Sequence, residues 1–140
     1  MAAPIPGRFR TFKPAEAELA QELLERRLIP GEVRAGVPLE TARSRQVLDV
    51  DPRAGFWSRY PWMFKVDLVI EGPDGVTIVE VEEDLRLANL GKLLIYRQLY
   101  VEQYRPGKSV RLAVVARRDV PEMRAVLEGA GVRVEVLERA

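Results

Sequence analysis

Apolar positions in the second half of the chain follow two different periods, which predict alternating strands and helices. Residues 62–72 and 76–82 are strand-like runs, and the Gly-Pro-Asp-Gly turn between them predicts a hairpin. Residues 84–104 instead have the spacing of a long helix. A strand, a helix and a last strand are then predicted over residues 109–116, 120–131 and 132–138. Because strands joined by crossover helices pair in parallel, we expect an α/β fold with a mixed central sheet flanked by helices.

The first sixty residues give a less regular pattern. Residues 14–29 predict a helix that is stopped by the Pro-Gly pair that follows it. We expect a strand over residues 45–50, RQVLDV, and an aromatic, basic loop over residues 55–62, GFWSRYPW. Residues 1–13 are expected to form a flexible basic N-terminal arm, and residues 14–140 a single domain, since a chain of 140 residues can bury one core.

The turn at residues 72–75 also predicts how the hairpin strands align. With these four residues as the loop, Asp67 lies opposite Glu80 and Lys65 lies opposite Glu82, all on one face of the sheet. Opposed like charges cost ~0.2–1 kcal/mol when exposed, and more when buried. A divalent cation between the acids would remove that cost. Alternatively, the acids lie at a solvated strand end, with Glu82 paired to Lys65, and the pattern leaves both interpretations open.

Composition narrows the chemistry that such a cluster could perform. The chain has no Cys and no His, which excludes disulfides, thiol nucleophiles, Ser-His-Asp triads and zinc sites built on those residues. Any metal site must therefore use oxygen ligands, which favours Mg²⁺, Mn²⁺ or Ca²⁺. No secretory signal and no apolar run of membrane-spanning length is visible, so we expect a cytoplasmic protein without membrane contact.

The order of these elements and acids resembles the PD-(D/E)XK nuclease superfamily. Its signature is an Asp on the second strand, (D/E)-x-K on the third, and often Gly-Gln-x-x-x-Tyr on the next helix. The matching residues here are Asp67 in KVDLVI, Glu80 and Glu82 in VEVEE, and Gly91, Lys92 and Tyr96 in LGKLLIY. The resemblance covers roughly residues 14–116. It implies a restriction-endonuclease-like α-β-β-β-α-β core with an added α-β, in which residues 45–50 are the first strand.

This resemblance also implies an activity. Asp67 and Glu80 would bind Mg²⁺, with Mn²⁺ as a possible substitute, helped by the carbonyl of Val81. The protein would be a metal-dependent DNA endonuclease, or a nuclease-like protein, that hydrolyses phosphodiester bonds. Its partners would be DNA and a second copy of itself in a homodimer. The residues implied in catalysis are Asp67, Glu80, Glu82 and Lys92.

Two residues differ from the signature, and they leave a second interpretation open for the activity. Glu82 stands where the superfamily has lysine, and Lys92 stands where it has glutamine. Lys92 or Lys65 could supply the missing cation beside the phosphate. The alternative is a catalytically inactive nuclease-fold protein that acts as a DNA-binding or protein-interaction module.

Helical spacing and aromatic clustering give the remaining expectations. Tyr96 and Tyr100 are expected to serve helix packing, and the acids of the leading helix are expected to form a solvated charged face. Basic and aromatic residues interleave over residues 53–62, which suits either a nucleic-acid surface or a dimer interface. An apolar stripe on the long helix is expected to face the sheet, and it comprises Leu87, Leu90, Gly91, Leu94 and Val101.

Overall fold

A computed structural model describes residues 12–139, and its five strands form one mixed sheet in the order β1-β2-β3-β4-β5. The first three strands pair antiparallel, and β3, β4 and β5 pair in parallel. Their bounds are Glu32–Leu39 for β1, Phe64–Glu71 for β2, Gly75–Asp84 for β3, Ser109–Arg118 for β4 and Val132–Val136 for β5. The predicted α/β class with a mixed sheet is confirmed.

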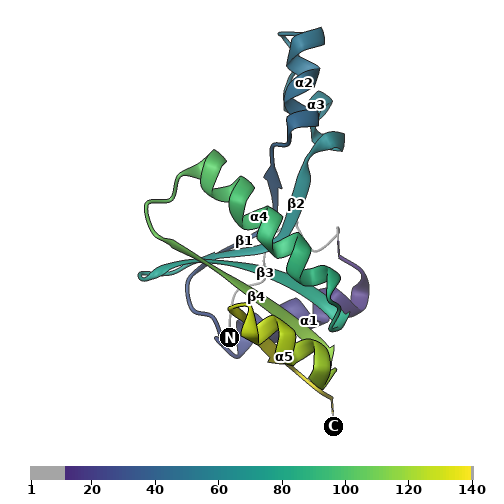
Figure 1. The fold of residues 1–140 in the computed structure, drawn as a ribbon, viewed down its shortest axis with the longest axis vertical. Helices are drawn as coiled ribbons and strands as arrows, with labels where there is room; N and C mark the ends of the chain where they lie inside the picture. Colours follow the sequence, from purple (N-terminus) through teal and green to yellow (C-terminus); the bar gives the residue numbers. More distant parts are fainter. Residues whose placement is uncertain (1–11, 140) are drawn as a thin grey trace.

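Helices cover both faces of this sheet (Figure 1). Helix α1 (Pro14–Glu25) packs on one face, and α4 (Ala88–Tyr104) and α5 (Pro121–Gly129) pack on the other. Both crossovers, β3-α4-β4 and β4-α5-β5, step across the sheet in the same direction. Since such crossovers are right-handed, their helices must lie on the same face.

The predicted alignment of the hairpin is confirmed. Leu68 pairs with Val79 and Glu71 pairs with Val76, and the N–H of Gly72 donates to the carbonyl of Gly75 at 2.9 Å across the turn. The apolar residues on both sides of the hairpin are buried, because each face is covered by a helix.

The strand expected over residues 45–50 is wrong, because this segment belongs to helix α2 (Ala42–Val50). Thr41 caps that helix: its hydroxyl accepts from the N–H of Ser44 at 3.0 Å, and the Ser44 hydroxyl accepts from the N–H of Thr41 at 2.8 Å. The strand that pairs with β2 is instead β1, whose pattern is broken by Gly36 at φ 60° and by Pro38.

The aromatic segment expected as a loop is also helical. It forms the short helix α3 (Phe56–Arg59) and the 3₁₀ turn η2 (Tyr60–Trp62). Together with α2 these elements make up residues 40–63, which we call the insertion. Figure 1 shows the insertion projecting away from the sheet beyond the ends of β1 and β2.

Helix α4 turns a different side to the sheet from the one its apolar stripe predicted. Its buried residues are Asn89, Leu93, Tyr96 and Tyr100. Leu87, Leu94 and Val101 are exposed, and the space around Gly91 is open. Burying two tyrosine rings removes more apolar surface from water than burying a stripe that contains glycine, so the tyrosine side faces the core. The packing role expected for Tyr96 and Tyr100 is therefore confirmed.

Two further expectations concern the N-terminal arm and membrane contact. The N-terminal arm expected over residues 1–13 lies almost wholly outside the described residues. Within residues 12–139, no helix is long and apolar enough to cross a membrane.

The orientation of α4 can be tested with two neighbouring leucines. Leu93 is fully buried and Leu94 is 42% exposed. We expect Leu93→Ala to lower the free energy of unfolding by ~2–5 kcal/mol, and Leu94→Ala to change it by less than about 0.5 kcal/mol. Urea denaturation followed by circular dichroism measures both. Equal losses, or a larger loss for Leu94, would contradict this orientation.

Candidate functional site

The acids predicted as metal ligands come from neighbouring strands of the hairpin. Asp67 lies on β2 and Glu80 on β3, one step beyond the paired residues Leu68 and Val79. Both belong to the face that α4 covers, and Glu80 is only 3% exposed. Asp67 Oδ2 accepts a hydrogen bond from the N–H of Val81 at 2.9 Å, which fixes its carboxylate across the strand pair.

Burial makes both carboxylates hold their protons more strongly than usual. Loss of hydration raises the pKa of Asp67 to about 6, opposed by the hydrogen bond from Val81. Loss of hydration and the charge of Asp67 raise the pKa of Glu80 to about 8. A buried pair of this kind is a common property of sites that act on ions or protons.

Lys92 is the cation nearest to this pair. Its Nζ lies 4.0 Å from Glu80 Oε2, and its positive charge lowers the pKa of both acids against the effects that raise it. The Lys92 side chain is 51% exposed, so it borders both the buried Glu80 carboxylate and solvent.

Lys65 does not lie where the alignment predicted. Its Nζ sits 4.2 Å from the centre of the Tyr60 ring on the insertion, and within residues 12–139 no ion pair joins it to Glu82. The ion pair of Glu82 with Lys65, one of the two alternatives left open by the sequence, is therefore not formed, since the cation is attracted to the aromatic face instead.

Glu82 is held by a residue that the sequence pattern did not reveal. Asn89 is 1% exposed; its Nδ2 donates to Glu82 Oε1 at 3.1 Å, and its Oδ1 accepts from the N–H of Arg86 at 3.0 Å. An asparagine near the start of a helix is usually assigned to its polar surface. The available signal was its spacing from Leu93, Tyr96 and Tyr100, which places it on the same side of α4.

The acids of the leading helix divide between two roles. Glu18 forms an ion pair with Arg139, and Glu22 pairs with Arg117 at 2.6 Å and with Arg26 at 2.8 Å. This part of the predicted charged face is thus tied to other elements of the fold. Glu16, which the sequence did not single out, raises the pKa of both Asp67 and Glu80 through its negative charge, so it lies close to the pair.

The oxygen donors present fit a divalent cation of the magnesium type. Among the described residues, no group of three or more His, Cys, Asp or Glu side chains is arranged to hold a metal. Magnesium, however, is usually bound by one or two carboxylates, and it completes its shell with waters and substrate phosphate. Asp67 and Glu80 supply two such carboxylates, and their repulsion is the cost that a cation would offset.

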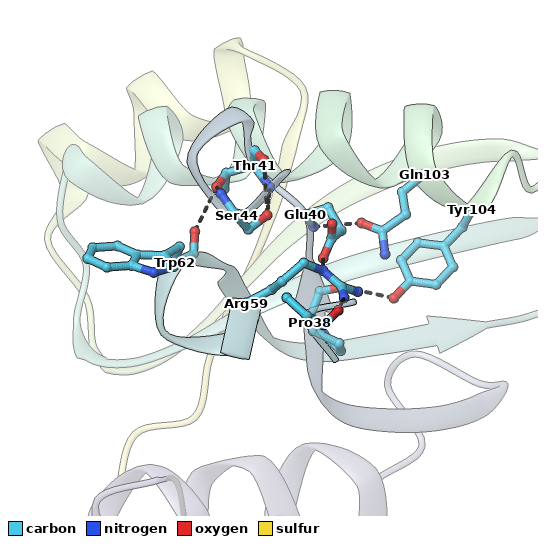
Figure 2. A network of polar contacts seen from close by, with 9 residues as sticks. Pro38, Glu40, Thr41, Ser44, Arg59, Trp62, Gln103 and Tyr104 are labelled. Carbon is cyan, nitrogen blue, oxygen red and sulfur yellow. Dashed lines mark hydrogen bonds and ion pairs between the residues drawn. The ribbon is translucent and has the colours of Figure 1, made fainter. Parts of the chain in front are cut away.

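A second polar cluster fastens the insertion to the body of the protein (Figure 2). Arg59 Nε lies 3.0 Å from Glu40 Oε1, and both side chains are largely buried. The N–H of Glu40 donates to Gln103 at 2.7 Å, and the Tyr104 hydroxyl donates to the carbonyl of Pro38 at 2.8 Å. Gln103 and Tyr104 are the last residues of α4. Their bonds to Glu40 and Pro38 therefore attach the insertion and the end of β1 to the helix that carries Lys92, and we call this attachment the root of the insertion.

Comparison with known proteins supports the fold. No protein-family model and no curated protein matches this chain. Its fold is similar to that of a repair endonuclease from Pyrococcus abyssi, with a TM-score of 0.50 and 22% identity, over 92% of this chain and 49% of that one. A protein of unknown function, AF1548, aligns with a TM-score of 0.45 and 11% identity, over 82% of this chain and 53% of that one. The chain spans about half the length of each, and the likeness to the endonuclease defines a nuclease-like α/β fold.

The raised pKa values predict that stability falls as the pH rises. Carboxylates in an unfolded chain titrate near 4, so between about pH 4 and pH 8 the folded chain holds more protons at Asp67 and Glu80 than the unfolded chain does. We therefore expect the free energy of unfolding, measured in urea without metal, to be greater at about pH 5 than at about pH 8.

Variants separate the effect of this pair from the titration of the other ionisable groups. Those groups contribute little over this pH range, because the chain lacks His. Asp67→Asn and Glu80→Gln should each flatten the dependence on pH. Glu18→Gln, which alters an exposed ion pair, should leave the slope as it is in the unmodified chain. A stability that rises over this range would contradict the assignment of the buried pair.

Proposed function

We propose that the chain is a metal-dependent DNA endonuclease domain of the PD-(D/E)XK type. The observation that carries this proposal is the buried pair Asp67 and Glu80, side by side on β2 and β3 of a nuclease-like fold. Burial raises the pKa of both acids, and the charge of Asp67 raises the pKa of Glu80 further, which suits a site that gains a cation.

In this proposal Asp67 and Glu80 hold Mg²⁺ or Mn²⁺. When bound, the ion supplies an activated water and offsets negative charge on the phosphate. The N–H of Val81 occupies Asp67 Oδ2 and so leaves the other oxygen for the ion. Glu82 and Glu16 also act on the pair, since the negative charge of each raises the pKa of both acids.

Lys92 takes the place of the signature lysine in this proposal. Its position 4.0 Å from Glu80 and its exposure to solvent suit a cation that would contact the reacting phosphate. Lys65 is less suited, because its charge is placed against Tyr60. The partner is DNA, and since one chain carries one such site, cutting both strands of a duplex would use a homodimer.

A second candidate is a nuclease-fold protein that binds DNA without cutting it. Glu82 favours this candidate, because it places a fixed negative charge where the signature has lysine, and Asn89 holds it there. That charge would repel a phosphate unless a cation compensates it.

Cleavage of a DNA panel tests both candidates. The panel would contain linear duplex, single-stranded, branched and flapped DNA with Mg²⁺ or Mn²⁺. We expect metal-dependent cutting that falls at least about a hundredfold in Asp67→Asn and in Glu80→Gln, since a catalytic metal contributes several kcal/mol. Glu18→Gln serves as the matched control and should cut normally. Intact DNA in every reaction, together with DNA binding, would favour the inactive protein.

The two lysines can be compared in the same assay. Lys92→Met should lower the cleavage rate about 10²–10³-fold, as expected for loss of one group that stabilises charge in the transition state. Lys65→Met should have a much smaller effect. A larger loss for Lys65 would reverse the two roles.

A further inference from the structure

Three aromatic rings form an exposed cluster on the insertion. The ring centres of Phe56, Trp57 and Tyr60 lie 5.0–5.5 Å apart, in tilted and edge-to-face contacts. Trp57 is 75% exposed, which is unusual for the largest apolar side chain. The mutual contacts of the rings hold them in place while one broad face of the cluster stays open to solvent.

A groove of about 570 Å³ runs beside this cluster. The rings of Phe56, Trp57 and Tyr60 form one wall, β1 residues 33–38 form the other, and Tyr104 lines it as well. Arg34 is the one cation among the lining residues, which all belong to the described part of the chain. Its guanidinium donates to the Tyr100 hydroxyl at 3.1 Å and lies 3.7 Å from a carboxylate oxygen of Glu71, outside the lining. Aromatic walls suit a flat ring that stacks on them, and a half-exposed guanidinium adds a contact for an attached phosphate.

The exposed edge of β1 argues against an added peptide strand as the occupant. Gly36 takes a left-handed conformation at φ 60°, and Pro38 has no N–H to donate. Both features interrupt the regular row of backbone groups that a strand from another protein would need. Recognition in the groove must therefore depend on its side chains.

The insertion, whose rings line the groove, relates the groove to the candidate site through the order of the strands. The insertion connects the end of β1 to the start of β2, and in this antiparallel arrangement the end of β3 with Glu80 lies at the same end of the sheet. Phe64 follows the insertion, and its ring centre lies 5.9 Å from that of Tyr96. Burial, and after it the charge of Glu80, raises the pKa of Tyr96. One tyrosine thus lies between the root of the insertion and the carboxylates.

We propose that this groove binds unpaired nucleobases of a DNA substrate, with Trp57 as the main stacking surface. The identity of the occupant rests on the proposed nuclease function. The root on α4, through Glu40 with Arg59 and with Gln103, holds the rings in position before DNA arrives. A single-stranded segment in the groove would place the neighbouring phosphates toward Asp67 and Glu80.

Tryptophan fluorescence can measure this binding directly. The chain has two tryptophans, so Trp62→Phe leaves Trp57 as the single emitter. Oligothymidylate would be titrated into this variant with EDTA present, which prevents metal-dependent cutting. A second titration would use an oligomer of the same length made of abasic sites, which keeps the phosphates and lacks the bases. We expect quenching by the first oligomer and little or none by the second.

Affinity measurements on variants give the matching test. In fluorescence anisotropy with labelled oligothymidylate, Trp57→Ala should weaken binding by about fivefold to a hundredfold, the range for loss of one base–aromatic stack. Trp57→Phe keeps an aromatic ring and should recover most of the affinity. Val50→Ala alters another highly exposed apolar residue of the insertion, which does not line the groove, and should bind normally.

Salt dependence and self-association distinguish base stacking from phosphate binding and from a protein interface. Because the groove has one cation, the logarithm of affinity should fall by only about 0.7 per tenfold rise in salt. Equal binding of the abasic oligomer, no quenching, or unchanged affinity in Trp57→Ala would overturn the proposal. Self-association seen in analytical sedimentation and abolished by Trp57→Ala would also overturn it, because the cluster would then be a protein interface.

The outcome stays separate from that of the proposed nuclease function. Binding in EDTA does not depend on cutting, so quenching with no cleavage of the DNA panel would keep this groove and reject the nuclease. Cleavage of the DNA panel without quenching would keep the nuclease and reject this groove. Asp67→Asn should quench like its parent, because that change leaves the groove unaltered.

Discussion

Two carboxylates that face one another inside a sheet constrain the groups around them. Asp67 and Glu80 are neighbours on β2 and β3, where burial raises both pKa values. The strands cannot shift to separate them, because apolar pairs such as Val69 with Ile78 are buried and hold the alignment. The arrangement lowers the stability of the chain alone at neutral pH, so selection for folding does not account for it. The proposed cation would account for it, which is why the proposed function starts from this pair.

The sequence predicted those parts of the fold that depend on local pattern. The Gly-Pro-Asp-Gly turn sets the hairpin alignment by its length, and alternating or helical spacing identified each element from β2 to β5. It did not identify β1, because Gly36 and Pro38 interrupt the strand pattern and its partner lies beyond a helical insertion. Nor did it orient α4, since both sides of that helix carry apolar residues and the choice depends on how the tyrosines pack against the sheet.

The candidate site shows the same division between local and tertiary information. Asp67 and Glu80 come together through the turn, so their proximity was predictable. The contact of Asn89 with Glu82 was not predictable, because it depends on which side of α4 faces the sheet. Glu16 and Lys65 also depend on tertiary contacts, one with the carboxylate pair and the other with the Tyr60 ring of the insertion. Side chains from separate elements, therefore, decide the chemistry that the hairpin acids can perform.

The insertion and the carboxylate pair both contact helix α4, so the insertion is more than a support for its exposed rings. Gln103 and Tyr104 hold the insertion root to the end of α4, while Asn89 and Lys92 near the start of the same helix contact Glu82 and Glu80. The two sets of contacts therefore lie at opposite ends of one helix. A flexible loop with the same rings would gather DNA without fixing its position. In the proposed complex, a rooted insertion would set the distance between a bound base and the acids, and that distance would determine which phosphate they reach.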